Sequence, residues 1–534
     1  MARTRSRPRP TRAQTLTPVT THCPVCGHRL WADYTNYRTV TTLDAVTRLT
    51  LDIRRCHHRG CPRYLRPYRP EAEPHFALPH HEFGLDVLAL IGCLRHAGHR
   101  SIPEIHGEMT RRGVTLAERT VSNLLDRYDE LKALAAADPK RLGPLLGDQG
   151  RVVVAIDGLQ PDVGHEVLWV LRDCLSGEVL LARSLLSATA KDLGTLLAEV
   201  QATLPVAITG VISDGQESIR NAVAQTLPGV PHQLCQFHYL REAAKPIHEA
   251  DRHAKKELKK RVRGIRKIER AAEGEDDAEG EIVRGYCAAV RAALTADGLP
   301  PLAAPGLLLH ERLSRIADSL DRVTARVGDL PGGLGKLRRL LRRGLEETAT
   351  LWPEVRVAYR WVKQVARVLK NPTRQGAAAV RRQLAGLLGA MRQAAAKAGE
   401  TLRAQLLRFM KVTRSYWPGL FVCYDRAGVP RTNNDLEHLF GSHRYHERRA
   451  SGRRRGTPGL VVSGSVRVVS SLATRLRPEE GLRLAEGYVE SWRRTRAALD
   501  KRREGRRRQR RFRHDPGTYL KQLEDMCFQL SLLP

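Results

Sequence analysis

The sequence predicts an α/β domain that is interrupted by a long all-helical insertion and preceded by two small N-terminal domains. Three observations lead to this fold class. Between residues 148 and 240, short apolar runs typical of strands alternate with helical patterns. Strand patterns are then absent over residues 241–428, after which a polar segment begins. Two cysteine pairs and three helical patterns precede the first long apolar run.

The composition favours a polyanionic partner. The chain has 534 residues, which predicts several domains, and a hydrophobic content of 42%, which is enough for buried cores. It carries 90 lysines and arginines against 57 aspartates and glutamates, a formal net charge of +33. Binding phosphates with such charges releases condensed counterions. We therefore expect nucleic acid as the partner, with a membrane surface as the rival.

Residues 1–18 form an arginine- and proline-rich segment without the apolar core of a secretory signal. We expect a disordered basic arm there. No apolar run approaches the roughly 18 residues needed to span a bilayer, and no basic amphipathic helix carries a bulky apolar face. These features predict a cytoplasmic, nucleoid-associated protein without a membrane partner.

Residues 19–76 contain two cysteine pairs with the spacings C-x2-C and C-x4-C. The four residues are Cys23, Cys26, Cys56 and Cys61. Two such pairs on separate turns can close a tetrahedral thiolate site for Zn²⁺. The alternatives are four free, buried cysteines, or His57 or His58 in place of one cysteine. The spacing predicts a zinc ribbon whose metal is structural, because four protein ligands leave no open position for catalysis.

Residues 80–140 predict three helices. The second has Ser101 as its N-cap and stops at Gly113, and the third is opened by Thr115. A short turn with glycine between such helices is typical of a helix-turn-helix DNA-binding domain. Side chains early in the third helix would then face the major groove: Glu118, Arg119, Ser122 and Asn123. The alternative is a three-helix bundle that packs on the next domain, and residues 135–150 predict a linker.

Residues 148–240 predict the order β-β-β-α-β-α-β. The first strand includes "RVVVAID", and the second and third form a hairpin that turns at Ser176 and Gly177. The fourth strand, in "VAITGVISDG", ends at Asp214, just as the first ends at Asp157. Three strands thus come from one meander, and two more alternate with helices.

The remainder of the chain predicts helices. Residues 241–428 form the helical insertion. Residues 429–475 open on the polar cluster "TNNDLEHLF", which predicts a helix with its N-cap between Thr432 and Asn434. Residues 476–534 predict a basic C-terminal helical tail.

Three acidic residues at the ends of these elements predict a catalytic metal site. If the first and fourth strands are neighbours, Asp157 and Asp214 emerge at one sheet edge, and Glu437 lies on a helix beside it. Clustered carboxylates repel unless cations neutralise them, and Mg²⁺ prefers carboxylate oxygens together with substrate phosphate. Two ions about 4 Å apart stabilise the attacking and leaving oxygens of an in-line phosphoryl displacement. We expect Asp157 to bridge both ions, Asp214 to bind one and Glu437 the other, with Mn²⁺ as an alternative to Mg²⁺.

Each of these residues also has a simpler interpretation. Asp157 and Asp214 both precede glycine, as turn or helix-capping residues often do. Glu437 alone would be a surface residue of a helix. Asp435 competes with Glu437, although it lies two positions away and points to a different helix face.

The ordered combination of these features resembles a known family. The strand order, the spacing Asp–Asp–Glu, the motif "CQFH" and the long helical insertion resemble DDE transposases with an RNase H-like catalytic domain. The likeness covers roughly residues 150–475 and is nearest to the Mutator-like and hAT-like group and its bacterial insertion-sequence relatives. Those proteins carry a C-x2-H motif after the second aspartate, here Cys235 and His238. The resemblance implies a structural or DNA-contacting role for this pair, and the alternative is a pair that only fixes packing.

Six arginines follow Glu437 within about one element and can hold phosphates through bidentate contacts. They are Arg444, Arg448, Arg449, Arg453, Arg454 and Arg455. The alternative is a solvated loop.

The sequence thus predicts a DNA transposase of an insertion sequence that binds transposon ends and acts on target DNA. Water would cut at the element ends, and the freed 3′-OH would attack target DNA at the same Mg²⁺ site. Because two ends must be brought together, we expect at least a homodimer. The rivals are a catalytically inactive or domesticated DNA-binding regulator, and another RNase H-like nuclease.

Overall fold

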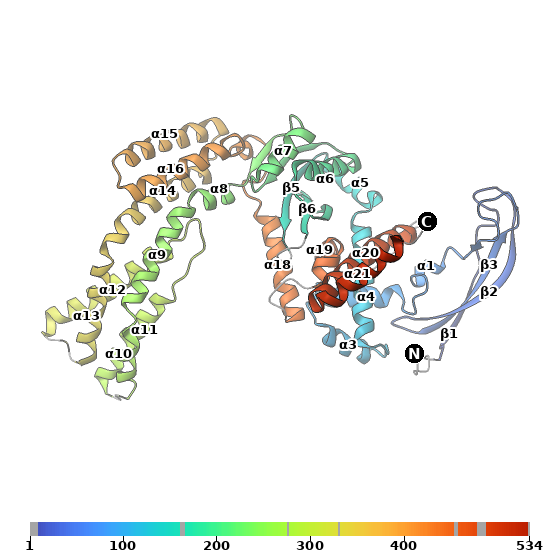
Figure 1. Ribbon diagram of the computed structural model, residues 1–534, viewed down its shortest axis with the longest axis horizontal. Coiled ribbons are helices and arrows are strands. Elements are labelled where there is room, and N and C mark those ends of the chain that lie inside the picture. Colours follow the sequence, from blue (N-terminus) through green and yellow to red (C-terminus); the bar gives the residue numbers. More distant parts are fainter. Residues whose placement is uncertain are drawn as a thin grey trace. The chain divides into compact units, whose positions relative to one another are not determined.

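The computed structural model describes residues 9–160, 166–274, 277–328, 330, 332–452, 458–477 and 488–531. The chain divides into two compact units (Figure 1). The first comprises Met1–Ile208 and Asp435–Pro534, and the second comprises Thr209–Asn434. The first unit is therefore built from both ends of the chain, and the second is one continuous segment.

A small sheet opens the first unit. It contains the strands β1 (Arg12–Leu16), β2 (Leu30–Thr41), β3 (Val46–Cys56) and β4 (Pro67–Tyr68). β2 and β4 are antiparallel to β3, whereas β1 is parallel to it. Alternate residues of β3, including Leu49, Leu51 and Ile53, are fully buried, as the period of two along a strand requires.

The expectation of a disordered arm over residues 1–18 is wrong for the segment that forms β1. Residues 12–16 pair with the free edge of β3 and bury Leu16. The backbone hydrogen bonds of an open strand edge attract a further strand whatever its charge. The count of arginines alone could not reveal this pairing.

Helices α1 to α5 follow. Their bounds are α1 (Glu73–Phe76), α2 (Leu85–His96), α3 (Ile102–Arg111), α4 (Glu118–Ala136) and α5 (Pro139–Gln149). The N-cap predicted at Ser101 is present and forms part of a capping box, because the side chains of Ser101 and Glu104 each bond the other residue's backbone N–H. Helix α4 begins at Glu118 with Ala117 as N-cap, so the start predicted at Thr115 is wrong by one turn.

Helix α5 occupies most of the segment predicted as a linker. The Asp138 side chain accepts a hydrogen bond from the backbone N–H of Lys140, and Pro139 stands at the first helical position. Gly150, with φ of 74°, ends the helix. The interior residues Gly143, Pro144 and Gly147 led to the linker prediction, although the segment has clear helix start and stop signals.

The second sheet has the strand order β7-β6-β5-β8-β9. The strands are β5 (Val152–Leu159), β6 (Val167–Asp173), β7 (Val179–Leu185), β8 (Ile208–Ser213) and β9 (His232–Leu234). The intervening helices are α6 (Ala190–Thr203) and α7 (Glu217–Thr226). The predicted order β-β-β-α-β-α-β is therefore present, including the hairpin turn, where Gly177 has φ of 78°. β5, β6 and β7 are antiparallel neighbours, whereas β8 and β9 are parallel.

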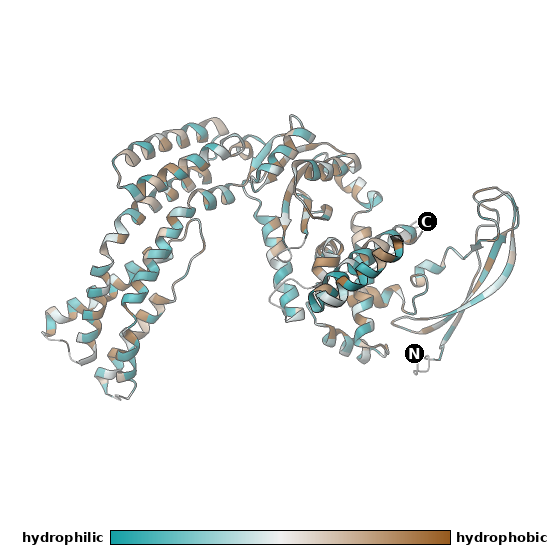
Figure 2. Ribbon diagram, in the orientation of Figure 1, coloured by the Kyte–Doolittle hydropathy of each residue, from teal (hydrophilic) through white to brown (hydrophobic). Residues whose placement is uncertain are grey.

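The rest of the second unit is helical, as expected for residues 241–428. Its elements are α8 (Gln236–Ala243), α9 (Lys245–Arg261), α10 (Ile265–Ala272), α11 (Ala278–Leu294), α12 (Pro305–Val327), α13 (Gly332–Glu347), η1 (Ala349–Leu351), α14 (Trp352–Lys370), α15 (Ala377–Ala396), α16 (Glu400–Tyr416), η2 (Trp417–Gly419) and α17 (Val422–Asp425). Figure 2 shows hydrophilic and hydrophobic residues mixed along each of these helices. In α14, for example, Val355, Tyr359 and Val362 face a buried cluster at helical spacing.

The C-terminal helices return to the first unit. They are α18 (Asn434–Ser451), α19 (Pro458–Leu476), α20 (Tyr488–His514) and α21 (Pro516–Ser531). Trp492 of α20 packs into the hydrophobic cluster of α2, α3 and α4. Within the part of the chain described, no helix combines the length and the apolarity that crossing a bilayer requires.

Candidate functional site

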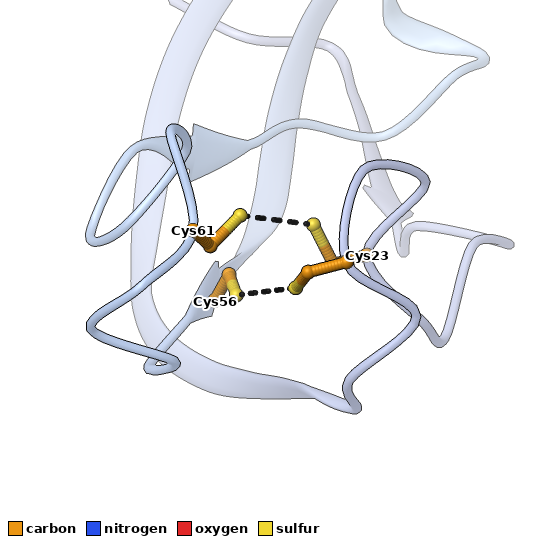
Figure 3. Close-up of side chains that lie close together, drawn as sticks. Cys23, Cys56 and Cys61 are labelled. Atoms are coloured by element: carbon orange, nitrogen blue, oxygen red, sulfur yellow. Dashed lines mark hydrogen bonds between the residues drawn. The ribbon is translucent and has the colours of Figure 1, made fainter.

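The four predicted cysteines come together at one end of the N-terminal sheet (Figure 3). Cys23 Sγ lies 3.8 Å from Cys61 Sγ, and Cys26 Sγ lies 3.5 Å from Cys56 Sγ. All four sulfur atoms lie within 4.8 Å of one another. Cys56 ends β3, while Cys23 and Cys26 flank the tight turn before β2, where Gly27 has φ of 72°.

The sulfur separations suit a tetrahedral metal site. Four thiolates about 2.3 Å from a zinc ion would lie about 3.8 Å from one another. Cys23, Cys56 and Cys61 are buried, so the cluster is closed to solvent on most sides. The cluster could therefore hold a metal ion and is compatible with structural zinc.

The thiols of the cluster cannot all ionise unaided. The Tyr68 hydroxyl, 3.1 Å from Cys23 Sγ, lowers the pKa of Cys23 to about 6. At Cys61, the backbone N–H of Arg63 lowers the pKa, but burial and the neighbouring thiols raise it more strongly, to about 12. A divalent cation would remove this conflict, because it deprotonates the thiols that it binds.

Histidine does not replace a cysteine in this cluster. His28 and His58 form a second group with Cys26, but their rings stack in parallel, with centroids 4.0 Å apart and an interplanar angle of 7°. Parallel rings direct their in-plane lone pairs side by side rather than toward one ion. His57 belongs to neither group of ligands found in the described residues.

Asp157 lies inside β5 rather than at its end. The strand continues through Gly158 to Leu159, and Asp157 pairs with Val170 of β6. Its carboxylate is half-buried and accepts a hydrogen bond of 2.8 Å from the backbone N–H of Gly158. The turn interpretation of Asp157 is therefore wrong, and the backbone that carries this carboxylate is held in a sheet.

Asp214 directly follows β8, at a turn of the second unit. Its carboxylate accepts from the backbone N–H of Gln216 at 2.9 Å, and its own carbonyl accepts from the Tyr416 hydroxyl at 2.9 Å. Gly215 has φ of 90°, and a Cβ there would lie 2.7 Å from the Tyr416 ring. Both the backbone angle and the tight contact require glycine at this position.

Glu437 lies in the first turn of α18, whose start at Asn434 agrees with the predicted N-cap region. The side chain is half-buried, whereas that of Asp435 is exposed. Asp157 and Glu437 belong to the first unit and Asp214 to the second. Among the described residues, groups of three or more ligand atoms within 4.8 Å occur only near the cysteines.

Cys235 and His238 lie at the start of α8. The backbone N–H of Cys235 donates to the Ser213 carbonyl at 2.8 Å, and the buried Cys235 Sγ accepts from the backbone N–H of Asn433 at 3.3 Å. Cys235 thus ties the residue before Asp214 to the segment just before α18. These contacts give the packing alternative for Cys235 a concrete geometry within the second unit.

The predicted DNA-contacting residues of α4 occupy its first two turns. Arg119 and Asn123 are exposed and Ser122 is half-buried, whereas α4 is largely buried from Leu124 onward. The buried half carries Glu130, which accepts from Trp492 Nε1 at 2.8 Å. Helix α4 thus has an accessible N-terminal end, and the rest of the helix packs against its neighbours.

The predicted arginine cluster falls partly on α18. Arg444, Arg448 and Arg449 are exposed on that helix rather than in a loop. Arg453, Arg454 and Arg455 lie outside the described residues.

Two features of the structure were missed from the sequence. Tyr416 lies in the ordinary-looking segment "SYWPG", and nothing in its spacing marks it as a partner of Asp214. Asp129 of α4 is fully buried and accepts from His96 Nε2 at 2.7 Å and from Arg467 Nε at 3.0 Å. Burial raises the pKa of Asp129, but the charges of His96 and Arg467 outweigh it and lower the pKa to about 2. This network joins α2, α4 and α19.

One comparison bears on the class of protein. Residues 195–297 match the family model described as "Transposase, Mutator family". The matched residues include Asp214, Cys235 and His238, whereas Asp157 and Glu437 lie outside them. The match supports a DNA transposase, which is a DNA-cleaving enzyme and so has DNA as its partner. No curated protein matches the chain.

Proposed function

We propose that this chain is a transposase of the DDE class, with Asp157, Asp214 and Glu437 as its catalytic carboxylates in an RNase H-like domain. The observation that carries the proposal is the Mutator-family match over residues 195–297, which includes Asp214 and the C-x2-H pair. The element order also supports an RNase H-like domain, because β5, β6 and β7 form a meander and β8 and β9 alternate with helices.

Strand geometry supports a common position for the first two carboxylates. The backbone N–H of Val152, at the start of β5, donates to the carbonyl of Ala207, just before β8. Asp157 follows five residues after Val152, and Asp214 follows seven after Ala207. With a rise of about 3.3 Å per residue, both would emerge near one sheet edge.

Fixed backbone positions suit this role, because a catalytic group must hold its geometry through the reaction. Asp157 is held by the β5–β6 ladder, and Asp214 by its turn and by Tyr416. Three carboxylates offer the hard oxygen ligands that Mg²⁺ prefers. When bound, two such ions would stabilise the attacking and leaving oxygens.

The reaction would have two in-line displacements. In the first, the oxygen of water attacks a phosphorus at the element end, the P–O3′ bond breaks, and a 3′-OH and a 5′-phosphate result. In the second, this 3′-OH attacks a phosphorus of target DNA, a new P–O bond forms, and a target 3′-OH leaves. Neither step requires a covalent bond between protein and DNA.

The other parts of the chain would then deliver DNA to this site. We propose that the N-terminal cysteine domain is a zinc ribbon and that α2 to α4 form a helix-turn-helix that presents Arg119, Ser122 and Asn123 to transposon ends. The exposed Arg444, Arg448 and Arg449 of α18 would hold phosphates near Glu437. Synapsis of two ends would require at least a dimer.

The test is cleavage of a plasmid that carries the chain's own gene with its flanking DNA. We expect Mg²⁺-dependent nicks at the element ends and joined products with a second plasmid. Asp157→Ala and Asp214→Ala should each lower the rate by about 10³-fold or more. Unchanged activity in either variant would refute the proposal.

The same assay separates the two rivals. Cleavage without joined products would favour another RNase H-like nuclease. Binding of element ends without any cleavage by the wild-type chain would favour a DNA-binding regulator.

A further inference from the structure

Helix α8 leads directly into α9 in the second unit, and the chain changes direction between them (Figure 1). Ala244 joins them in a helical conformation, with φ of −86° and ψ of 0°. Its N–H donates to the carbonyl of Leu240, and the N–H of His248 donates to the carbonyl of Ala244, both at 2.9 Å. One of these bonds ends α8 and the other begins α9 at Ala244, and Pro246 has no N–H to donate across the junction.

Four basic or ionisable side chains stand along these two helices. His238 and Arg241 of α8 are three residues apart, as are Lys245 and His248 of α9. Such spacing places the two members of each pair on one face of their helix. Ten residues at 1.5 Å each give the row of four a length of at most about 15 Å.

The same four side chains line a cavity of about 460 Å³ beside Asp214. Gly215 and Tyr416 form the wall next to the aspartate. A volume in this range suits a ligand of nucleotide size. The row therefore shares one cavity with a proposed catalytic carboxylate.

The charges in the cavity favour an anionic ligand. Its one glutamate, Glu242, accepts from the Tyr416 hydroxyl at 3.0 Å and lies 3.6 Å from the guanidinium of Arg408. Arg241 and Lys245 are exposed, and in the described part of the chain neither forms an ion pair. The cavity is thus lined by the carboxylates of Asp214 and Glu242, of which Glu242 is paired with Arg408, and by two cations that can bind phosphate.

We propose that this row, hereafter the α8–α9 track, binds consecutive phosphates of one DNA strand next to the cleavage position. The inference rests on the proposed function, because it takes the DNA strand at Asp214 as given. A stacked strand rises about 3.4 Å per nucleotide, so a track of about 15 Å covers roughly four phosphates. Arg241 and Lys245 supply the permanent charge, and His238 and His248 flank them as hydrogen-bonding groups.

The experiment measures binding of a fluorescent single strand of about 12 nucleotides to the full-length chain without divalent metal, over a range of salt concentrations. Each phosphate contact to a single strand contributes about 0.7 to the slope of log affinity against log salt. The double variant Arg241→Gln/Lys245→Gln should therefore lower this slope by about 1.4. The charge-conserving variant Arg241→Lys/Lys245→Arg should keep it.

The matched control is Arg382→Gln/Arg392→Gln, which removes the same charge from exposed positions of α15 that do not line the cavity. We expect its slope to equal that of the wild-type chain. If the two glutamine variants change the slope equally, only the overall charge matters and the α8–α9 track is refuted.

A second arm distinguishes a strand from a free nucleotide. Competitor strands should gain affinity up to a length of about four nucleotides, whereas a nucleoside triphosphate should compete weakly. Full competition by the triphosphate would overturn the proposal in favour of a small-molecule site. Binding is measured without metal, so it is independent of cleavage. If the wild-type chain cleaves DNA but Arg241→Gln/Lys245→Gln keeps the wild-type slope, the α8–α9 track is refuted and the proposed function stands. If the wild-type chain does not cleave DNA, the proposed function is refuted.

Discussion

The cysteine cluster and the acidic triad are both sets of distant residues, but they differ in how the chain joins their members. The cysteines all flank one antiparallel pair, β2 and β3, whose register places Leu30 opposite Cys56. The acidic residues run from 157 to 437 and belong to two units of the chain. A hairpin brings its two ends together by local geometry alone, whereas the proposed triad would depend on packing between segments far apart in the chain. Substitutions outside the N-terminal sheet should therefore leave the geometry of the cysteine cluster unchanged. Substitutions far from the acidic residues should be able to alter the geometry of the proposed triad.

The largest expected effect comes from breaking the cysteine cluster, which is proposed to bind zinc. Cys56→Ser removes one thiolate from a closed four-sulfur site, and structural zinc sites contribute on the order of 10 kcal/mol to folding. We expect one zinc per wild-type chain by native mass spectrometry, none in Cys56→Ser, and rapid proteolysis of residues 9–76 in that variant. Cys93→Ser, which alters a cysteine outside the cluster, is the control. Equal zinc content in the two variants would contradict the proposed site.

The next effect distinguishes Glu437 from its neighbour on α18. Glu437→Gln keeps the shape of the side chain but removes the charge needed to hold a cation, so cleavage should fall about 10³-fold, or about 4 kcal/mol in barrier. Asp435→Asn makes the same chemical change at an exposed position two residues away and should stay within a few-fold of wild type. The reverse result would move the third carboxylate to Asp435.

A smaller effect concerns pH and the helix that carries Glu437. His443 of α18 is buried, and its Nε2 has no hydrogen-bond partner among the described residues. Burial lowers its pKa from 6.5 to about 4. The folded protein thus favours neutral His443, and this preference is complete above pH 6.5 and lost as the pH falls toward 4.

Protonation of His443 should cost roughly 3 kcal/mol of unfolding free energy over that interval. Urea unfolding at about pH 7.5 and about pH 4 measures this loss of unfolding free energy. Between the same two pH values, His443→Leu should lose roughly 3 kcal/mol less than the wild-type chain. If both proteins lose equal stability, other groups cause the acid sensitivity.

The smallest expected effect tests whether Tyr416 positions Asp214. Tyr416→Phe removes the hydroxyl that donates to the Asp214 carbonyl but keeps the ring against Gly215. We expect the cleavage rate to fall about tenfold, or about 1.4 kcal/mol, with a higher half-saturating Mg²⁺ concentration. Tyr239→Phe removes a buried hydroxyl that bonds Thr413 in the same core, and it should leave that concentration unchanged. A similar shift in both variants would indicate a general packing effect.

The sequence was sufficient wherever a pattern is local. Strand order, the Ser176–Gly177 turn and the cap at Ser101 follow from residues close together in the chain, and the structure has all three. The strand β1 and the helix α5 were missed, because an open sheet edge and a capping aspartate outweighed composition. Tyr416 and the Asp129 network could not be predicted, because their partners lie far away along the chain and have no periodic spacing.

The central claim, that three remote carboxylates share one metal centre, can be tested directly with Fe²⁺ in place of Mg²⁺. With ascorbate and peroxide, bound Fe²⁺ generates radicals that cut the backbone next to its ligands. The account predicts cuts near residues 157, 214 and 437 in the wild-type chain, and the loss of all three in Asp157→Ala. Cuts at only one of these positions, or cuts near 214 and 437 that persist in Asp157→Ala, would contradict a shared site.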